Sequence, residues 1–450
     1  MKANALKDIF RVPELRNRIL FTLAMLAVYR LGVFVPSPGV DRTALASFFA
    51  SNSDTLFGLY DMFSGGALER FSVFVLGIMP YISASIIMQL LSATVPQLER
   101  LSKEGQSGRN KITQYTRYGT IVIAILQSIG IGIGLQSMKA AGGQDIVINA
   151  GPWFVFMTVM TMTAGSCFVM WLGEQITERG VGNGASLLIT AGIIAGMPQG
   201  IFQLIQKIQA GEMKLVFLVG LGIFMFLVLG GIVFFERAQR RLPIQYAKRV
   251  IGRRVYGGQA THLPLKVNVA GVIPPIFASA LLMFPATLAT FWDNAIVQQV
   301  IGALTPGAWL YNLVYVALII FFAFFYTAVT FSPVDVADNL KKQGGYVPGV
   351  RPGKQTAEYI DTILSRLTLA GAVYLAAVCI VPTILIGEFG IPFYFGGTSL
   401  LIVVSVSLDT VSQIEGHLLT KHYDGLMGDG GGGGGGRGRR RRLLEKSEDT

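Results

Sequence analysis

The sequence predicts an all-α integral membrane protein with ten transmembrane helices. Of its 450 residues, 52% are hydrophobic and only 14% are charged, whereas an ordinary soluble domain carries roughly 25% charged residues. Mean hydropathy is +0.54, and long uncharged runs separate the charges. Because a helix needs about 20 apolar residues to cross the hydrocarbon core, each such run is a candidate span.

Ten runs can each hold one helix. The first, Ile19–Val35, is interrupted only by Arg30, which lies close enough to one end to snorkel to the interface. The run Asn294–Val334 is too long for one span, and its usable core is Trp309–Phe331. The other eight candidates are Phe71–Leu98, Tyr118–Met138, Ile146–Gly173, Gly180–Gln206, Leu215–Phe235, Val267–Trp292, Leu367–Gly387 and Phe389–Leu408.

The distribution of basic residues predicts the orientation in the membrane. An even number of spans puts both termini on one side. If that side is the interior, the interior segments hold 31 of the 37 Lys and Arg residues and the exterior segments hold 5. The positive-inside rule therefore places both termini in the cytoplasm. The net charge of +11 is explained by this topology, and a nucleic-acid function would need further support.

Ten spans divide naturally into two pseudo-symmetric halves of five. Such halves often form inverted repeats around a central pathway, although no repeat is visible here in residue identities. We expect a cytoplasmic N-terminal segment at 1–18, a first transmembrane half at 19–196, an exterior hinge loop at 197–214, a second half at 215–410, and a cytoplasmic tail at 411–450 that is disordered after about 427. Loops 237–266 and 332–366 are longer than a connection requires and should project into the cytoplasm.

The exterior segment 54–71 predicts a short re-entrant element. It is moderately apolar but contains Ser64-Gly65-Gly66. Irregular backbone at membrane depth needs surrounding protein or a water-filled cavity, because hydrocarbon leaves its N–H and C=O groups unpaired. The segment therefore indicates a cavity inside the bundle.

The sequence gives little support to an enzyme. It has three histidines, all on the predicted cytoplasmic side, and no HExxH, GxSxG, Walker or paired-cysteine pattern. Cys167 and Cys379 both fall within predicted spans, where neither a disulfide framework nor a zinc site is indicated. We therefore expect no catalytic residues, no cofactor and no metal.

A secondary transporter is the main physical alternative to a passive channel. Transporters usually place ionisable groups near the membrane midplane, but the span centres here are nearly uncharged. The candidate pathway helices instead carry isoleucines: Ile78 and Ile82 around Pro80, Ile189, Ile276 after Pro274 and Pro275, and Ile402. Taken alone, these are ordinary packing residues.

Several ordered stretches resemble the SecY/Sec61-alpha family, in its bacterial form, over roughly residues 10–425. They are MFSGGA at 62–67, GIMPYIS at 77–83, GEQITERG at 173–180, GNG at 182–184, RRVY at 253–256, HLPLKVN at 262–268, VPGVRPG at 347–353 and PFYFGGTS at 392–399. The resemblance implies a protein-conducting channel, with a central hourglass pore closed on the outer side by a short plug helix.

The resemblance also implies roles for individual residues. The aliphatic pore ring would be Ile78, Ile82, Ala185, Ile189, Ile276 and Ile402, and the plug, at about 56–71, would include Met62, Phe63, Ser64, Gly65, Gly66, Ala67, Leu68, Glu69, Arg70 and Phe71. Ala185 is smaller than the bulky aliphatic residue expected there. Either Leu188 or a plug residue fills the gap, or the ring is looser.

The family's lateral gate lies between the second and third spans on one side and the seventh and eighth on the other. On that face, Ser83, Gln89 and Asn268 are polar groups that could bond across a closed interface. Arg253, Arg254 and Arg351 in the long basic loops would dock the ribosome and the motor SecA. The implied partners are SecE, SecG, signal peptides, nascent polypeptides and membrane lipid, in the bacterial cytoplasmic membrane.

Overall fold

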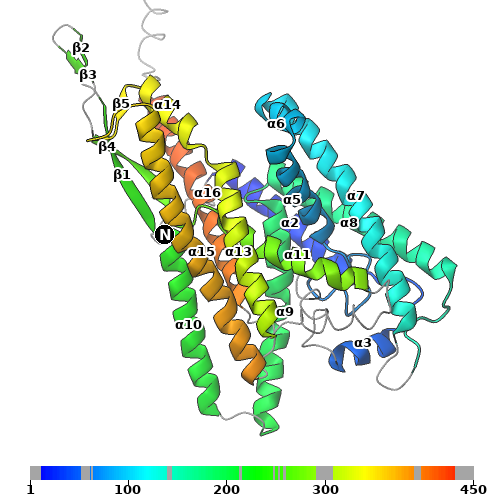
Figure 1. Cartoon of the computed structure of the whole chain (residues 1–450). Coiled ribbons are helices and arrows are strands. Elements are labelled where there is room, and N and C mark those ends of the chain that lie inside the picture. Colours follow the sequence, from blue (N-terminus) through cyan, green and yellow to red (C-terminus); the bar gives the residue numbers. More distant parts are fainter. Residues whose placement is uncertain are drawn as a thin grey trace, which may run out of the picture.

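The computed structural model shows a bundle of long helices with a small β-sheet at one end (Figure 1). It describes residues 12–51, 61, 64–138, 144–211, 215–246, 249–251, 254–256, 260–289, 308–389 and 397–430. The described helices are α2 (Pro13–Val33), α3 (Arg42–Ser51), α5 (Met79–Thr94), α6 (Pro96–Lys103), α7 (Gln106–Ser137), α8 (Pro152–Arg179), α9 (Gly184–Gln209), α10 (Leu215–Arg237), α11 (Ile273–Ala289), α13 (Trp309–Thr330), α14 (Pro333–Lys342), α15 (Lys354–Phe389) and α16 (Gly397–Gly430).

Each predicted span overlaps one long described helix, in the order α2, α5, α7, α8, α9, α10, α11, α13, α15 and α16. Among the described residues, seven helices are long and apolar enough to cross a membrane. The other three differ: α5 is bent by 99° from α6, the apolar part described for α11 is short, and α2 begins with charged residues. The chain is thus mainly helical with several membrane-spanning helices.

The second span begins later than the uncharged run predicted. Residues 71–78 form turns, and α5 starts only at Met79. Phe71 and Gly77 have φ angles of 45° and 53°, in the left-handed region that interrupts a right-handed helix. Pro80 in the first turn of α5 then favours helix initiation, because the missing N–H would have no intrahelical partner there.

The two halves share a local repeat where their first pathway helices begin. Residues 77–85 read GIMPYISAS and residues 271–279 read GVIPPIFAS, with five of nine positions identical. The leading glycines, Gly77 and Gly271, both have positive φ, at 53° and 63°, and a helix starts two residues after each. Ile82 and Ile276 therefore occupy equivalent positions, and the expectation that residue identities show no repeat was wrong.

The halves meet along a few helices. In the first half, α7 packs on α5 and α8, and α8 on α9; in the second, α13 packs on α11 and α15, and α16 on α10 and α15. Between the halves, α9 lies against α16, while α11 lies against α5 and α7. Buried side chains from both halves join one large hydrophobic cluster.

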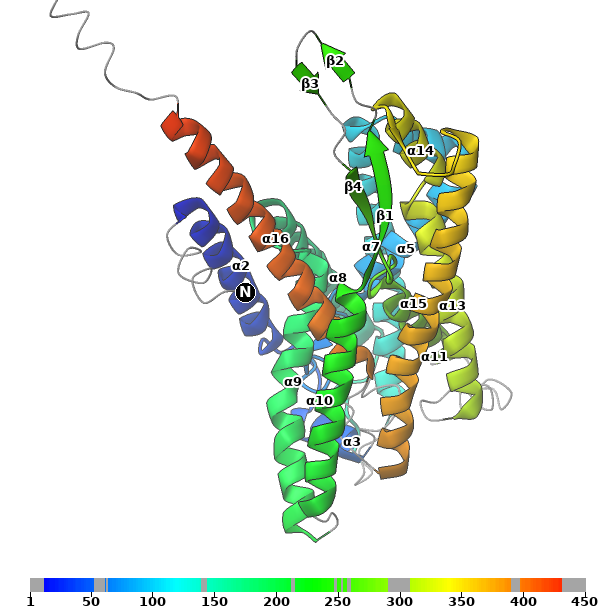
Figure 2. The same cartoon turned by 90° about the vertical axis from the view of Figure 1, so that its left-hand side faces the viewer.

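Two small sheets depart from the all-helical expectation. Strand β1 (Gln239–Tyr246) pairs antiparallel with β4 (Ala260–Lys266) and β5 (Gly345–Tyr346), and β2 (Arg249–Ile251) pairs with β3 (Arg254–Tyr256). Leu242 and Ile244 alternate with exposed residues and pack with Ile360 and Ile363 of α15. The two long loops therefore fold against each other at one end of the bundle, called the sheet end below (Figures 1 and 2).

Several helices are longer than the uncharged segments from which they were predicted. At 1.5 Å per residue, the 32 residues of α7 and the 36 of α15 reach about 48 and 54 Å, against roughly 30 Å of hydrocarbon. Helix α16 continues to Gly430. The segments 1–11 and 431–450, and hence most of the tail expected to be disordered, lie outside the described residues.

Candidate constriction, plug and gate

The predicted ring residues come from four helices and from the turn before one of them. Ile78 is the N-cap of α5 and Ile82 lies in its first turns; Ala185 and Ile189 lie on α9, Ile276 on α11, and Ile402 on α16. All five isoleucines are buried, with exposed fractions between 0% and 7%, and belong to the same hydrophobic cluster. Ala185 packs against that cluster while partly exposed.

Ala185 is held close to Ile78 by a glycine on α8. A Cβ atom added to Gly173 would lie 3.3 Å from Ile78 Cδ1, 3.5 Å from Leu188 Cδ1 and 3.6 Å from the Ala185 nitrogen. Leu188 is 1% exposed. A bulky side chain is thus packed one helical turn from Ala185, beside the same glycine.

In the described part of the predicted plug, Asp61 and Ser64 are helical and residues 65–71 form turns. Gly65 and Gly66 have φ angles of 71° and 82°, which end any helix at Ser64. Ala67, Leu68 and Phe71 are buried in the main cluster, while Glu69 and Arg70 are partly exposed. Met62 and Phe63 lie outside the described residues.

Two neighbouring side chains of α2 bind the plug backbone. The Tyr29 hydroxyl donates to the Ser64 carbonyl at 3.2 Å, and Arg30 Nη1 donates to the Gly65 carbonyl at 2.7 Å. A Cβ on Gly65 would lie 2.9 Å from Gly192 Cα of α9, so only glycine allows this approach. Whether Arg30 also reaches the membrane interface stays a prediction, while its guanidinium is bound to the plug carbonyl.

Asp61 is a buried acid that the sequence expectation missed. Its Oδ1 accepts hydrogen bonds from the backbone N–H groups of Leu68 and Glu69, both at 2.9 Å, and the residue is 5% exposed. Burial raises its pKa from 3.8 to about 6, with Glu69 also raising it and Arg70 lowering it. No local pattern marks Asp61, since its burial depends on the plug folding back on it.

Ser83 and Gln89 lie on α5 and Asn268 lies five residues before α11, and among the described residues the hydrogen bonds of these predicted gate residues stay within their own halves. Gln89 donates to Ser85 Oγ of the same helix at 3.3 Å. Asn268 donates to Glu236 Oε1 at 2.8 Å and to the Gly271 carbonyl at 3.1 Å. Ser83 is partly exposed. Within the described part of the chain, none of the three bonds to the opposite half.

Arg351 is exposed at a turn between β5 and α15. Gly349 and Gly353 flank it with φ angles of 80° and 107°, and Thr356 Oγ1 donates to the Arg351 carbonyl at 2.9 Å. These contacts fix the backbone and leave the guanidinium at the surface of the sheet end. Arg254 lies on β3, but its side chain and all of Arg253 are outside what the structure describes.

The described residues contain no group of three or more His, Cys, Asp or Glu side chains that could hold a metal ion. Cys167 lies within α8 and Cys379 lies within α15. The arrangement instead consists of an apolar cluster between the two halves, a short irregular segment tied to α2, and a basic sheet end.

Comparisons with known proteins agree with this architecture. A sequence model of the family described as SecY matches residues 72–411. The chain is 51% identical over 420 residues to the protein translocase subunit SecY of Pseudomonas aeruginosa, and 50% identical over 418 residues to that of Escherichia coli K12. Each alignment covers 92% of this chain and 94% of the relative.

Solved structures with the same fold include one described as a protein conducting channel, with a TM-score of 0.64 and 16% identity, and a SecY protein described by its plug domain, with 0.63 and 19%. Sec61 in the canine ribosome-channel complex gives 0.60 and 16%. Each alignment covers 89% of this chain and 91% of the other.

Proposed function

The chain belongs to the SecY family of protein translocase subunits, and we propose that it forms the pore of a protein export channel. It is a multi-pass membrane protein. The channel conducts unfolded secretory polypeptides and releases hydrophobic segments sideways into lipid. The observation that carries this proposal is the burial of five isoleucines from both halves in one apolar cluster between α5, α9, α11 and α16.

An apolar ring explains how one feature can both seal and conduct. A hydrophobic constriction holds water poorly and therefore resists ion flow, while flexible uncharged side chains offer no strong binding site to a passing chain. Ile78, Ile82, Ile189, Ile276 and Ile402 form this ring together with Ala185. The packing of Leu188 beside Gly173 supports it as the residue that compensates for the small Ala185 side chain.

The plug closes the outer side of the ring. Its support is the pair of hydrogen bonds from Tyr29 and Arg30 to consecutive plug carbonyls, together with the close approach of Gly65 to α9. Each contact involves a backbone group that a small displacement would release. Opening therefore requires the loss of these directed contacts and of the burial of Ala67, Leu68 and Phe71.

The lateral gate is the contact of α11 with α5 and α7. Because the bonds of Gln89 and Asn268 remain within their own halves, the closed contact is mostly apolar packing. In a bilayer such packing competes only with lipid contacts of similar strength. An apolar signal-peptide segment can then displace α11 from this contact and pack against α5 and α7 in its place.

The channel is passive and carries out no ATP chemistry. Arg351 at the basic sheet end docks the ribosome and SecA together with Arg253 and Arg254 of the loop 237–266, since a guanidinium binds phosphates and carboxylates bidentately. SecE and SecG are the small membrane partners. The excess of Lys and Arg in the predicted interior segments supports both termini in the cytoplasm. The bacterial relatives support a location in the bacterial inner membrane.

Reconstitution tests this function. The full chain with SecE is placed in vesicles with SecA, ATP and a signal-bearing substrate, and protection of that substrate from added protease is measured. Signal-dependent protection supports the channel. Uptake of a small solute coupled to an ion gradient, with no protected substrate, would favour a transporter instead.

A further inference from the structure

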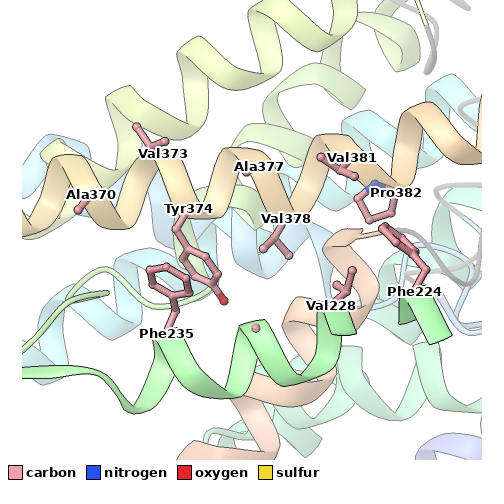
Figure 3. Close-up of a pocket in the computed structure, with 11 residues that line it drawn as sticks. Phe224, Val228, Phe235, Ala370, Val373, Tyr374, Ala377, Val378, Val381 and Pro382 are labelled. Atoms are coloured by element: carbon pink, nitrogen blue, oxygen red, sulfur yellow. The ribbon is translucent and has the colours of Figure 1, made fainter. Parts of the chain in front are cut away.

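An apolar groove of about 420 Å³ runs between α10 and α15. Figure 3 shows Phe224, Val228 and Phe235 on α10 facing Tyr374, Val378 and Pro382 on α15. The two helices stand on the opposite side of the bundle from α5 and α7 (Figure 1). The groove is therefore separate from the pore and the gate.

The wall of the groove offers hydrocarbon and almost no hydrogen-bonding groups. Tyr374 reaches from α15 toward α10, where its ring stacks on Phe235 with centroids 4.4 Å apart (Figure 3). Its hydroxyl is covered by protein, and the residue is 7% exposed. Gly231 keeps the groove open, because a Cβ added there meets no atom within 4 Å. An occupant must accordingly be apolar along its length.

We propose that this groove binds one acyl chain of an anionic phospholipid from the leaflet at the sheet end. The lining runs from Ala370 to Pro382 on α15, about 18 Å at 1.5 Å per residue. Half of a hydrocarbon core about 30 Å thick is about 15 Å, so the groove has the length of one leaflet. Only 6% of the apolar window of α10 is buried against the rest of this chain, so the groove opens toward the surroundings of the bundle.

Arginine side chains lie at the end of the groove where a lipid headgroup would bind. Arg366 precedes Ala370 by four residues and Tyr374 by eight, so all three lie on one stripe of α15. Arg366 is exposed and forms no salt bridge with another described residue. Arg237, also exposed, ends α10 two residues after Phe235. A phosphate at this end would receive a charge-assisted, bidentate bond while its chain enters the groove.

Two adjacent glycines provide a matched test. Gly230 and Gly231 both have open space around an added Cβ, but only Gly231 lines the groove. The full-length protein, purified with its membrane partners, is titrated with phosphatidylglycerol or phosphatidylcholine and bound lipid is counted by native mass spectrometry. Gly231→Leu should lose one phosphatidylglycerol that wild type and Gly230→Leu retain. Arg366→Gln should lower the preference for phosphatidylglycerol over phosphatidylcholine about fivefold.

Equal lipid retention by Gly231→Leu and wild type would overturn the proposal, as would no preference between the two lipids in wild type. A diazirine placed at Ala377 in the same membranes identifies the occupant directly. Lipid adducts support the proposal, and adducts with a neighbouring polypeptide would overturn it. Neither measurement depends on protein conduction, so a negative lipid-binding result would leave the proposed export function untouched.

Discussion

Arg30 Nη1 lies 2.7 Å from the carbonyl oxygen of Gly65 and joins the first long helix to the plug. The guanidinium also lies 5.1 Å from the centre of the Phe34 ring, which limits its freedom. A hydrogen bond made by a charged group is worth about 1.5–3 kcal/mol. This single contact is thus comparable to the free energy that separates a mostly closed gate from a frequently open one.

Replacing Arg30 should loosen the plug. Glutamine is too short to reach Gly65 and carries no charge, so Arg30→Gln should raise ion leak about tenfold or more in planar bilayers. Arg16→Gln is the control, because Arg16 is exposed on the same helix. Equal leak in the two variants would remove Arg30 from the closing mechanism.

Asp61 should make plug stability depend on pH. Burial raises its pKa to about 6 from 3.8, so the packed state favours the neutral acid. Its stabilisation is complete below the ordinary pKa and is lost as pH rises through about 6. Ion leak should therefore increase as the pH rises from about 3.8 to about 6, and change little above that range.

The variant Asp61→Asn keeps an oxygen for the N–H groups of Leu68 and Glu69 but cannot titrate. Its leak should be low and flat across this pH range. Glu69→Gln, which leaves Asp61 titratable, should retain the pH dependence. A flat profile in wild type would show that Asp61 does not control the plug.

Ile402→Asn should hydrate the constriction. Ile402 is completely buried in the main cluster, and an amide there both attracts water and removes apolar packing, which typically costs 2–5 kcal/mol for a large-to-small core change. We expect a larger ion leak than for Ser407→Asn, an exposed position on the same helix. Unchanged conductance in a bilayer recording would contradict the ring assignment.

Arg351→Glu should impair motor-driven export without affecting membrane insertion of the variant. Its guanidinium is exposed at a fixed turn, so charge reversal acts on the partner surface and leaves the core intact. Arg240→Glu on β1 provides the control, because Arg240 is also exposed and basic. Equal stimulation of both variants by SecA would place the docking site elsewhere.

Charge spacing in the sequence located the membrane helices well, because hydrocarbon excludes ionisable groups so strongly. It placed the second helix too early, since residues 71–78 are apolar yet form turns around Phe71 and Gly77. An apolar, uncharged run shows only that a segment avoids water. A membrane helix and a turn covered by protein both have such a composition. Only the positive φ angles distinguish the two.

The sheet end, the plug contacts and the gate were harder to predict from the sequence than the membrane helices. Leu242 and Ile244 carried a two-residue alternation that indicates a strand, but Pro243 and neighbouring arginines obscured it. Arg30 gave no sign of its long-range partner, because Gly65 is 35 residues away and comes close only through folding. The gate residues had suitable chemistry, yet Asn268 is satisfied within its own half.

The central claim is that buried isoleucines line the route of a translocating chain. It is tested most directly by photo-crosslinkers at Ile82 and Ile276 during export of a stalled secretory protein, with Ile87 and Leu281 as exposed controls on the same two helices, 47% and 49% accessible. The account predicts adducts with the stalled chain at Ile82 and Ile276 and lipid adducts at the controls. Lipid adducts at all four positions would contradict it.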